Sequence, residues 1–280
     1  MSEYVFDPAD GLNDEHVTCL GDVLDSITLA SLRSLDVHAG WHCLEIGGGS
    51  GSVAAWLGRH VGEQGHVTVT DIDTTHLESV PELDCANVTI ARHDVRYDPL
   101  PVESFDLVHA RLVLGHLDER EVVLETLTKS LRPGGWIVLD EFETVLPPVV
   151  MKTPGPEEEA LYRRVIAKIT EIIRHAGMDH EWGHRVYGCL TDLGMEEVTA
   201  VGAFHACPGG SAGMRLHHVV TRRLEKVLVH AGLTSEELIN FRRIIMRPDF
   251  VATSYPVIST RARKRCRASI THQAAVGQGR

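Results

Sequence analysis

The sequence predicts an α/β protein built on a doubly wound, mostly parallel sheet, and three observations lead to that fold class. A strand of buried character at residues 43–46 runs straight into a glycine-rich turn at residues 47–51. Further strand-like stretches alternate with helical stretches along the first half of the chain. Several of these strands end in an acidic residue. Strands that alternate with helices are typical of parallel, doubly wound sheets.

The first half of the chain supplies the elements of this sheet in order. After the glycine turn, a helix is expected to begin near Ser52. Acids stand near the carboxyl ends of the second and third strands, at Asp71 and Asp94. A turn at residues 132–135 precedes the fifth strand. The predicted strands cover residues 43–46, 66–73, 87–95, 105–111 and 136–140.

The glycine turn has the composition of a ligand-binding loop. Gly47, Gly49 and Gly51 can adopt positive φ and carry no Cβ, so the backbone can bend sharply and approach a bound molecule. The following helix directs its N-terminal amides at the same place. An acid at a strand end, such as Asp71, can accept both hydroxyls of a ribose. The dinucleotide fingerprint G-x-G-x-x-G/A requires glycine or alanine where this chain has Ser52, which disfavours NAD.

Acids and glycine spacing together point to another nucleotide-binding family. Glu45 precedes the first glycine by two residues, the glycines follow the pattern G-x-G-x-G, and Asp94 closes the third strand. This set resembles the class I S-adenosylmethionine-dependent methyltransferases, and the likeness covers roughly residues 20–145. The chain is also similar to the methyltransferases of ubiquinone and menaquinone biosynthesis and, more closely, to actinobacterial small-molecule methyltransferases. The matching segments are residues 41–57, 70–73, 93–94, 105–117 and 131–136.

The resemblance implies a Rossmann-like methyltransferase fold of seven strands, one of them antiparallel, with S-adenosyl-L-methionine as the cofactor. In that family the glycine turn packs against the methionine part of the cofactor. The acid matching Asp71 holds the ribose, and the acid matching Asp94, with the Val95 amide, binds the adenine. The implied cofactor-binding residues are Glu45, Gly47, Gly48, Gly49, Gly51, Asp71, Ile72, Asp94, Val95 and Arg111.

Length and composition fit one large domain or one domain with a cap. A chain of 280 residues with 43% apolar residues can fill a hydrophobic core. The formal net charge of −12 disfavours nucleic acid or an anionic membrane as a partner, since both bind basic surfaces. Six scattered cysteines without a C-x-x-C pair, and the lack of an export signal or a long apolar run, predict a reduced, cytoplasmic protein.

The chain is expected to divide into four segments. Residues 1–40 form a helical segment over the cofactor site, residues 41–146 the cofactor-binding core, residues 147–265 the substrate-side half, and residues 266–280 a flexible tail. A helical insertion at residues 209–247 is expected to roof the substrate pocket, because open α/β sheets bind ligands beyond the carboxyl ends of their strands. The alternative is a helix pair that only covers the sheet edge. The substrate-side half is predicted to hold helices at residues 157–175, 216–231 and 235–246 and strands at residues 196–207 and 250–260.

The expected chemistry is an in-line displacement, in which the protein holds the acceptor atom, the methyl carbon and the sulfur in line and excludes water. A hydroxyl acceptor benefits from a base. Glu141 and His116 are the candidate catalytic residues. Their plainer interpretations are a loop cap for Glu141 and a packed, loop-holding residue for His116. No metal is expected, because the histidines lack cysteine partners and the H-E-x-x-H pattern.

The favoured function is methyl transfer to a small molecule, with a secondary-metabolite hydroxyl of natural-product biosynthesis as the expected acceptor. Three alternatives stay open: a peptide or protein acceptor, a carbon or nitrogen acceptor, and a nucleotide-cofactor-binding protein that transfers no methyl group. The Asn/Asp-Pro-Pro-aromatic motif usual in amino-methylating DNA enzymes is replaced here by residues 109–112, His-Ala-Arg-Leu. The oligomeric state stays open, and a homo-oligomer is compatible with the sequence.

Overall fold

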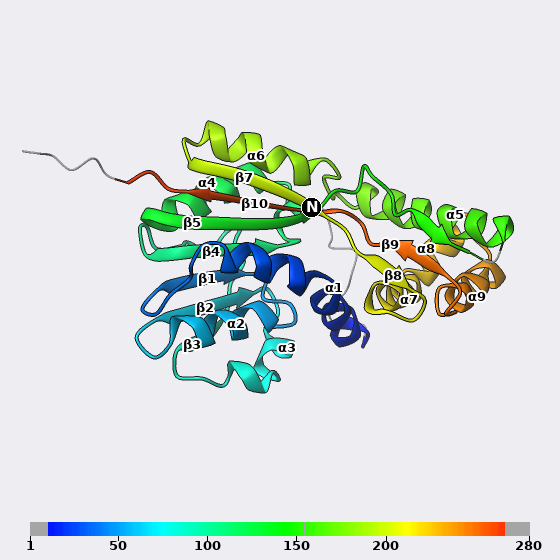
Figure 1. Cartoon of the computed structure of the whole chain (residues 1–280), viewed down its shortest axis with the longest axis horizontal. Helices are drawn as coiled ribbons and strands as arrows, with labels where there is room; N and C mark the ends of the chain where they lie inside the picture. The colour runs from blue at the N-terminus through cyan, green and yellow to red at the C-terminus, as the bar shows by residue number, and fades with distance from the viewer. Residues whose placement is uncertain (1–10, 154, 267–280) are drawn as a thin grey trace, which may run out of the picture.

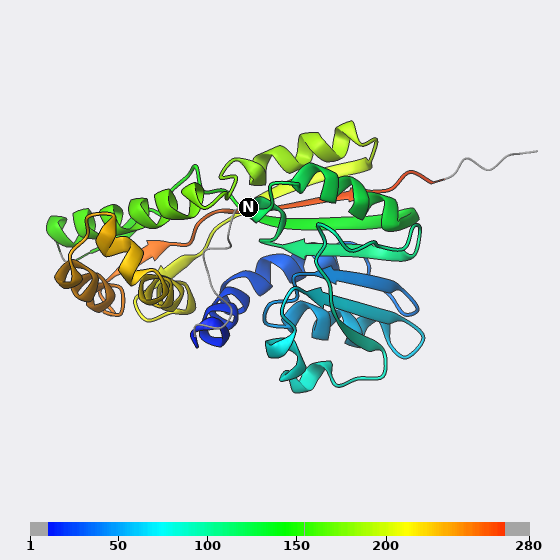
Figure 2. The same ribbon diagram turned by 180° about the vertical axis from the view of Figure 1, so that it is seen from behind.

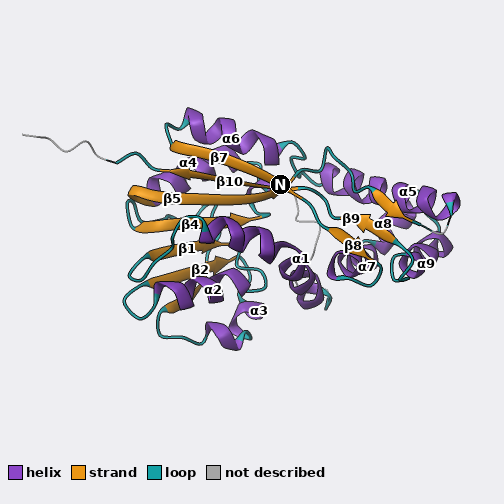
Figure 3. Ribbon diagram, viewed as in Figure 1, coloured by secondary structure: helices purple, strands orange, loops and turns teal. Residues whose placement is uncertain are grey.

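The computed structural model describes residues 11–153 and 155–266, which form a central sheet with helices on both faces and a helical cap beside it (Figures 1 and 3). Residues 1–10 of the predicted N-terminal segment and residues 267–280 of the predicted tail lie outside the described residues. In the described ranges, no helix combines the length and the apolar character that a membrane crossing requires.

The central sheet has seven strands in the order β3-β2-β1-β4-β5-β10-β7. The neighbours among β1 to β5 pair in parallel, whereas β10 lies antiparallel between β5 and β7. This order confirms the predicted doubly wound, mostly parallel sheet with one antiparallel strand. The strands are β1 (His42–Ile46), β2 (His66–Asp71), β3 (Val88–Arg92), β4 (Phe105–Arg111), β5 (Leu131–Phe142), β7 (Glu196–Ala203) and β10 (Val257–Arg263).

Helices cover both faces of this sheet. They are α1 (Asn13–Arg33) and α2 (Ser52–Val61) on one face and α4 (Arg120–Ser130) and α6 (Trp182–Asp192) on the other. Figure 2 shows the molecule from behind, with the face that α4 and α6 cover toward the viewer. Successive residues of β1 serve opposite faces: Cys43 packs in the cluster with α2, and Leu44 packs in the cluster with α4 and α6. This alternation follows from the two-residue period of a strand. Short helical turns follow β2 and β4: α3 (Thr75–Glu78), η1 (Pro81–Leu83) and η2 (Leu114–His116).

The cap has its own hydrophobic core beside the sheet. Tyr162 stacks on Phe241 with ring centroids 5.8 Å apart and lies 5.1 Å from the ring of Phe250. Helix α9 begins with a capping box in which Thr234 and Glu237 exchange hydrogen bonds between side chain and backbone. The described cap elements are α5 (Pro156–His175), α7 (Ala212–Arg223), α8 (Glu225–His230) and α9 (Ser235–Ile244), with a small antiparallel sheet of β6 (Val150–Lys152), β9 (Val251–Thr253) and β8 (Ala206–Pro208).

Two predicted strands are divided between the two sheets. The sequence predicts single strands at residues 196–207 and 250–260, whereas the first stretch forms β7 and β8 and the second forms β9 and β10. Both breaks lie where the chain passes between sheet and cap. There the His205 amide donates to Ser254 Oγ at 3.0 Å, and the Ser254 amide donates to the His205 carbonyl at 2.8 Å. These bonds hold the two crossings side by side.

The predicted turn at residues 132–135 lies inside β5. The strand already pairs at Leu131 with Phe105, and its register then shifts before Trp136 pairs with Leu107. Gly134, with φ of +85°, lies in this irregular stretch. The turn is therefore a bulge in a longer strand, because both of its flanks stay paired with β4.

Candidate functional site

A cavity of about 760 Å³ lies among the carboxyl edge of the parallel strands, α1 and the cap. Ligands of open α/β sheets bind at this edge. The volume falls within the range of about 300–1,000 Å³ that is usual for small-molecule sites. The cavity wall includes the glycine turn, the segments after β2, β3 and β4, the first turns of α1, and residues of α5 and α7.

The glycine turn bends where a side chain would collide with its surroundings. Gly47 and Gly49 have φ of +70° and +52°, and both line the cavity with Gly48. A Cβ on Gly47 would lie 2.4 Å from Cγ2 of Val113, and one on Gly48 would lie equally close to Val69. Both positions therefore require glycine, which lets the backbone form the cavity wall.

Gly51 has a different place from the other predicted glycines. It caps the N-terminus of α2 with φ of +76°, and a Cβ there would lie 2.9 Å from Cδ1 of Leu83. Among the described residues that line the cavity, Gly51 does not appear. Its conformation serves the turn into α2 instead of direct ligand contact.

The acid at the end of β2 lies on the cavity. Asp71 accepts hydrogen bonds from the Gly49 amide at 3.4 Å and from the Asp73 amide at 3.3 Å, so the carboxylate is tied to the glycine turn. Burial raises the pKa of Asp71, although these backbone hydrogen bonds oppose the shift. The neighbouring Ile72 also lines the cavity and is 47% exposed, which leaves an apolar surface for a ligand to cover.

The segment after β3 forms the adjoining wall. Asp94 and Val95 line the cavity, and Arg96 forms an ion pair with Asp94 at 2.6 Å. The hydrogen bond from Arg96 lowers the pKa of Asp94. His93 lies beside them with both ring nitrogens buried and without a hydrogen-bond partner among the described residues. Unpaired buried nitrogens are unfavourable, so this wall is suited to a ligand that carries hydrogen-bonding groups.

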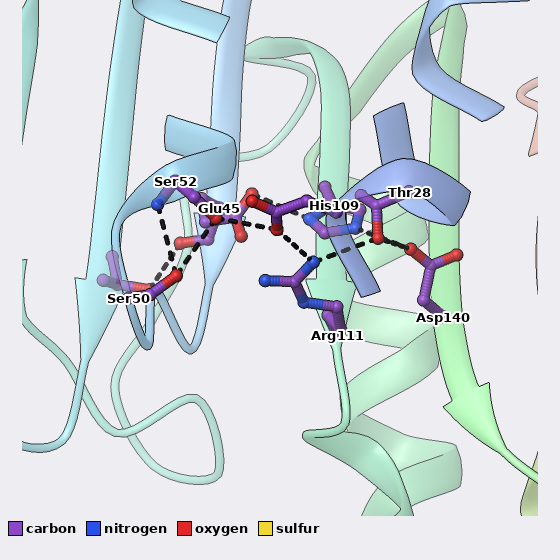
Figure 4. A network of polar contacts seen from close by, with 9 residues as sticks. Thr28, Glu45, Ser50, Ser52, His109, Arg111 and Asp140 are labelled. Atoms are coloured by element: carbon purple, nitrogen blue, oxygen red, sulfur yellow. Dashed lines mark hydrogen bonds and ion pairs between the residues drawn. The ribbon is translucent and has the colours of Figure 1, made fainter. Parts of the chain in front are cut away.

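Glu45 faces away from the cavity, into a buried network (Figure 4). His109 Nδ1 lies 2.8 Å from Glu45 Oε2, and His109 Nε2 lies 3.4 Å from Asp140 Oδ2. Burial alone would lower the pKa of His109, but the two carboxylates outweigh it and raise this pKa to about 9. Burial would likewise raise the pKa of Asp140, and the contact with His109 lowers it instead. The imidazolium is therefore held between two carboxylates.

Arg111 joins this network to the cavity wall. Its guanidinium donates to Asp25 at 2.9 Å and to Thr28 at 3.2 Å, both on α1. Asp25 also accepts a hydrogen bond from Ser52 Oγ, and Thr28 donates to Asp140 at 2.5 Å. Figure 4 shows Arg111 between the glycine turn and these partners. Helix α1 is thus fixed to the sheet and to the start of α2 by charged contacts.

The two candidate catalytic residues lie in different surroundings. Glu141 is 3% exposed and accepts a hydrogen bond from the Leu114 amide at 3.2 Å, and burial raises its pKa to about 8. The described cavity wall does not include it. His116 ends η2 and lines the cavity, where burial and Arg120 lower its pKa to about 4. At neutral pH, His116 is a neutral imidazole on the cavity.

Sequence reasoning missed the residues that the cap and α1 bring to the cavity. Thr170, His217 and Tyr255 line it from the cap side, and His16 and Leu20 line it from α1. The adjacent histidines at 217 and 218 give no usable signal, because a zinc site is disfavoured for lack of cysteine partners. No group of three or more metal-ligating side chains gathers within residues 11–153 and 155–266. No local pattern marks these five residues, because folding brings together segments that are far apart in the sequence.

These surroundings fit S-adenosylmethionine. The turn presents backbone where a charged amino-acid chain can approach, and Asp71 supplies a carboxylate for ribose hydroxyls. Ile72 offers an apolar face, and the unpaired nitrogens of His93 suit a purine edge. The fit rests on unsatisfied groups and glycine positions of this chain.

Comparison with known proteins points to the same family. A methyltransferase-domain family model matches residues 44–137. The ubiquinone/menaquinone biosynthesis C-methyltransferase UbiE of Yersinia pestis is 26% identical over 178 residues, which is 58% of this chain and 69% of UbiE.

Solved structures share the fold. The phosphoethanolamine N-methyltransferase 2 of Haemonchus contortus, in complex with phosphomonomethylethanolamine and S-adenosylhomocysteine, superposes with a TM-score of 0.55 at 16% identity, covering 92% of this chain and 59% of that one. The YcgJ protein of Bacillus subtilis gives a TM-score of 0.55 at 13% identity and covers 86% of this chain and 98% of its own. The strand order matches the Rossmann-like methyltransferase fold. Together with the glycine turn after β1, the acids Asp71 and Asp94 and the methyltransferase-domain match, it identifies the protein as an S-adenosylmethionine-dependent methyltransferase, with S-adenosylmethionine as its cofactor.

Proposed function

We propose that this methyltransferase transfers the methyl group to a hydroxyl of a small, largely apolar molecule of the secondary-metabolite type. The observation that carries the proposal is the wall between core and cap, where apolar side chains from several elements gather and a number of histidine, threonine and arginine side chains lie among them. Such walls are typical of small-molecule sites. The apolar residues on this wall include Leu20, Leu117, Phe142, Ile169, Ile173, Leu216 and Val220.

The cofactor is proposed to lie against the core wall. Gly47, Gly48 and Gly49 would hold its methionine part, Asp71 its ribose, and Ile72, Asp94 and Val95 its adenine, in line with the family resemblance. Glu45, Gly51 and Arg111 would act on the cofactor site mainly by fixing its surroundings, because their contacts run to His109, to α2 and to α1. When bound, S-adenosylmethionine supplies a methyl group on a positively charged sulfur.

His116 is the proposed catalytic base. It lines the cavity from η2, which follows β4, and its lowered pKa keeps the ring neutral at pH 7 while making it a weaker base than an ordinary histidine. Glu141 is proposed as a positioning residue, since its carboxyl group holds the Leu114 amide at the start of the same turn. The free cysteines suit the reducing cytoplasm that we propose as the compartment of this enzyme.

Titration calorimetry tests the cofactor site. S-adenosylmethionine and S-adenosylhomocysteine should bind, and NAD and NADP should bind more weakly or not at all. Asp71→Asn should weaken binding of S-adenosylhomocysteine by about 1–3 kcal/mol, because the ribose hydroxyls lose a charged acceptor. Asp84→Asn is the matched control, since Asp84 is exposed and is not among the residues that line the cavity. Equal affinity in Asp71→Asn and wild type would show that the ribose is held elsewhere.

A panel of hydroxyl, amine and activated-carbon acceptors with methyl-labelled cofactor tests the acceptor. We expect labelled methyl ethers from hydroxylated ring compounds. Products methylated only at nitrogen or carbon would overturn the hydroxyl assignment and leave the family assignment intact.

A further inference from the structure

The cap side of the cavity carries a small cluster of polar side chains next to several apolar ones. His217 of α7 is only 5% exposed, and its ring meets the ring of Tyr255 edge-on with centroids 6.1 Å apart. The Tyr255 hydroxyl lies 2.7 Å from Oγ1 of Thr170 on α5. All three residues line the cavity, and apolar residues such as Ile169 and Val220 line it as well.

The direction of the hydrogen bonds in this cluster can be assigned. Thr170 Oγ1 lies 3.0 Å from the Ile166 carbonyl, which can only accept, so Thr170 donates its single proton there. The bond between Thr170 and Tyr255 must then be donated by Tyr255. Burial raises the pKa of Tyr255 to about 12, so the phenol keeps its proton. The Tyr255 oxygen therefore still has a lone pair to accept a hydrogen bond.

His217 supplies the complementary group. No other described residue forms a hydrogen bond with its ring, and burial lowers its pKa to about 4. A neutral imidazole has one donor and one acceptor nitrogen. A buried polar group of this kind is unfavourable unless a partner satisfies it, and a ligand in the cavity that His217 lines can be that partner.

We propose that His217, Tyr255 and Thr170 form a subsite that binds a hydroxyl group of a ring-shaped, apolar acceptor. The proposal rests on the proposed function, because it concerns the acceptor of the same methyl transfer. A hydroxyl can donate to the Tyr255 oxygen and accept from the His217 N–H at the same time. A methoxy or keto oxygen can only accept, so it leaves the Tyr255 lone pair unused.

The shape of the wall favours a flat ring. The Tyr255 ring contacts both His217 of the cap and Phe142 of β5, with its centroid 5.7 Å from that of Phe142. Since aromatic rings pack well against flat ligands, these three rings on the cavity wall offer surface for a ring-shaped acceptor. The subsite lies on the cap wall and His116 on the core side, so the bound hydroxyl orients the acceptor and a second oxygen receives the methyl group. His217 and Tyr255 are thus specificity-determining residues.

The test uses 2-naphthol and 2-methoxynaphthalene as probes, with the full chain saturated with S-adenosylhomocysteine. Wild type should bind 2-naphthol about tenfold more tightly than 2-methoxynaphthalene. Tyr255→Phe and His217→Phe should each reduce this preference to about twofold or less. Affinity for S-adenosylhomocysteine should stay within about twofold. Tyr187→Phe is the matched control, since Tyr187 is exposed on α6 and should keep the full preference.

Thr170→Val gives a second, independent signature. Without the threonine oxygen, the Tyr255 hydroxyl is free to donate to the ligand, so this variant should bind 2-methoxynaphthalene more tightly than wild type does. A merely structural cluster would not produce that gain. If His217→Phe does not fold, Tyr255→Phe and Thr170→Val decide the question.

Equal binding of the two probes by wild type, binding of neither, or an undiminished preference in Tyr255→Phe would overturn the subsite. Failure of wild type to bind S-adenosylhomocysteine would instead overturn the proposed function. Normal cofactor binding without a hydroxyl preference would remove the subsite alone.

Discussion

The imidazole of His109 lies 2.8 Å from the carboxylate of Glu45, and both side chains are almost completely buried in the sheet. The acid that precedes the glycine turn is therefore bound to the neighbouring strand β4. On its other side, His109 approaches Asp140 of β5, so three strands are joined by charges beneath the cofactor site. A charged histidine between two buried carboxylates makes the stability of the sheet depend on pH.

The first prediction concerns this pH dependence. The pKa of His109 in the fold is about 9, above its usual 6.5, so the stabilisation is fully present below about pH 6.5 and is lost as pH rises through about 9. The shift corresponds to about 3 kcal/mol at most. Urea unfolding should therefore show His109→Gln to be strongly destabilised at pH 6.5, with the gap to wild type narrowing by pH 9.5.

His42→Gln is the control for that experiment, since His42 is exposed at the start of β1. It should unfold with the same pH profile as wild type. A gap between His109→Gln and wild type that stays constant from pH 6.5 to 9.5 would mean that His109 is neutral in the fold and acts only by packing.

The second prediction concerns the glycine turn. Gly47 and Gly62 have similar φ, +70° and +61°, but only a Cβ on Gly47 would collide, with Val113. Gly62, with ψ of −171°, lies in a backbone region that other residues rarely adopt, so Gly62→Ala should cost only that backbone strain, about 1–3 kcal/mol. Gly47→Ala should cost roughly 1–3 kcal/mol more through overpacking. Denaturant midpoints give both values.

Cofactor affinity should separate the same two variants. Because Gly47 lines the cavity, Gly47→Ala should weaken S-adenosylhomocysteine binding by about tenfold or more, whereas Gly62→Ala should bind as wild type does. Unchanged affinity in a folded Gly47→Ala protein would show that the cofactor does not approach this turn.

The third prediction separates the two candidate catalytic residues. The pKa of Glu141 is raised by burial to about 8, so its contribution to stability is lost as pH rises from about 4.5 through 8. Glu141→Gln keeps the neutral shape and the acceptor for the Leu114 amide. It should retain methyl transfer and remove this part of the pH dependence, whereas His116→Asn should lower kcat.

Glu125→Gln, on the exposed face of α4, controls for the loss of one negative charge. Unfolding free energies at pH 5 and pH 8 test the predicted change in the pH dependence of stability. Turnover with methyl-labelled cofactor tests the predicted effects on methyl transfer. Loss of turnover in a stable Glu141→Gln protein, with His116→Asn fully active, would reverse the two roles.

Sequence patterns locate the core wall of the cavity better than its cap wall, for a physical reason. The glycine turn and Asp71 lie at strand ends, where a local pattern of strand, turn and helix fixes their position. The sequence does not predict which way the Glu45 side chain points, because β1 is buried on both faces and its pattern does not distinguish the two sides. Thr170 and Tyr255 meet across 85 residues of sequence, and only tertiary packing brings them together.

Strand boundaries show the same limit. Residues 196–207 and 250–260 alternate like continuous strands, and alternation alone does not reveal that the chain leaves one sheet for another. The crossing depends on hydrogen bonds between His205 and Ser254, which are distant in sequence. A local pattern cannot contain that information.

The last prediction is that the cap can be loosened without loss of the cofactor. Phe241 is fully buried in the hydrophobic core of the cap, which is separate from the hydrophobic clusters that pack on the central sheet. Phe241→Ala should therefore lower the free energy of unfolding by about 3–5 kcal/mol and act mainly on the cap. Hydrogen exchange should rise in α5 and α7 to α9. Helix α1 stays fixed to the core through Asp25 and Arg111, so S-adenosylhomocysteine affinity should change less than about threefold while turnover falls sharply. Ile239 is exposed on α9, the helix that also holds Phe241, so Ile239→Ala should change neither cofactor affinity nor turnover. A parallel loss of cofactor affinity in Phe241→Ala would show that cap and core form one cooperative unit, and full turnover would show that the cap does not shape the acceptor pocket.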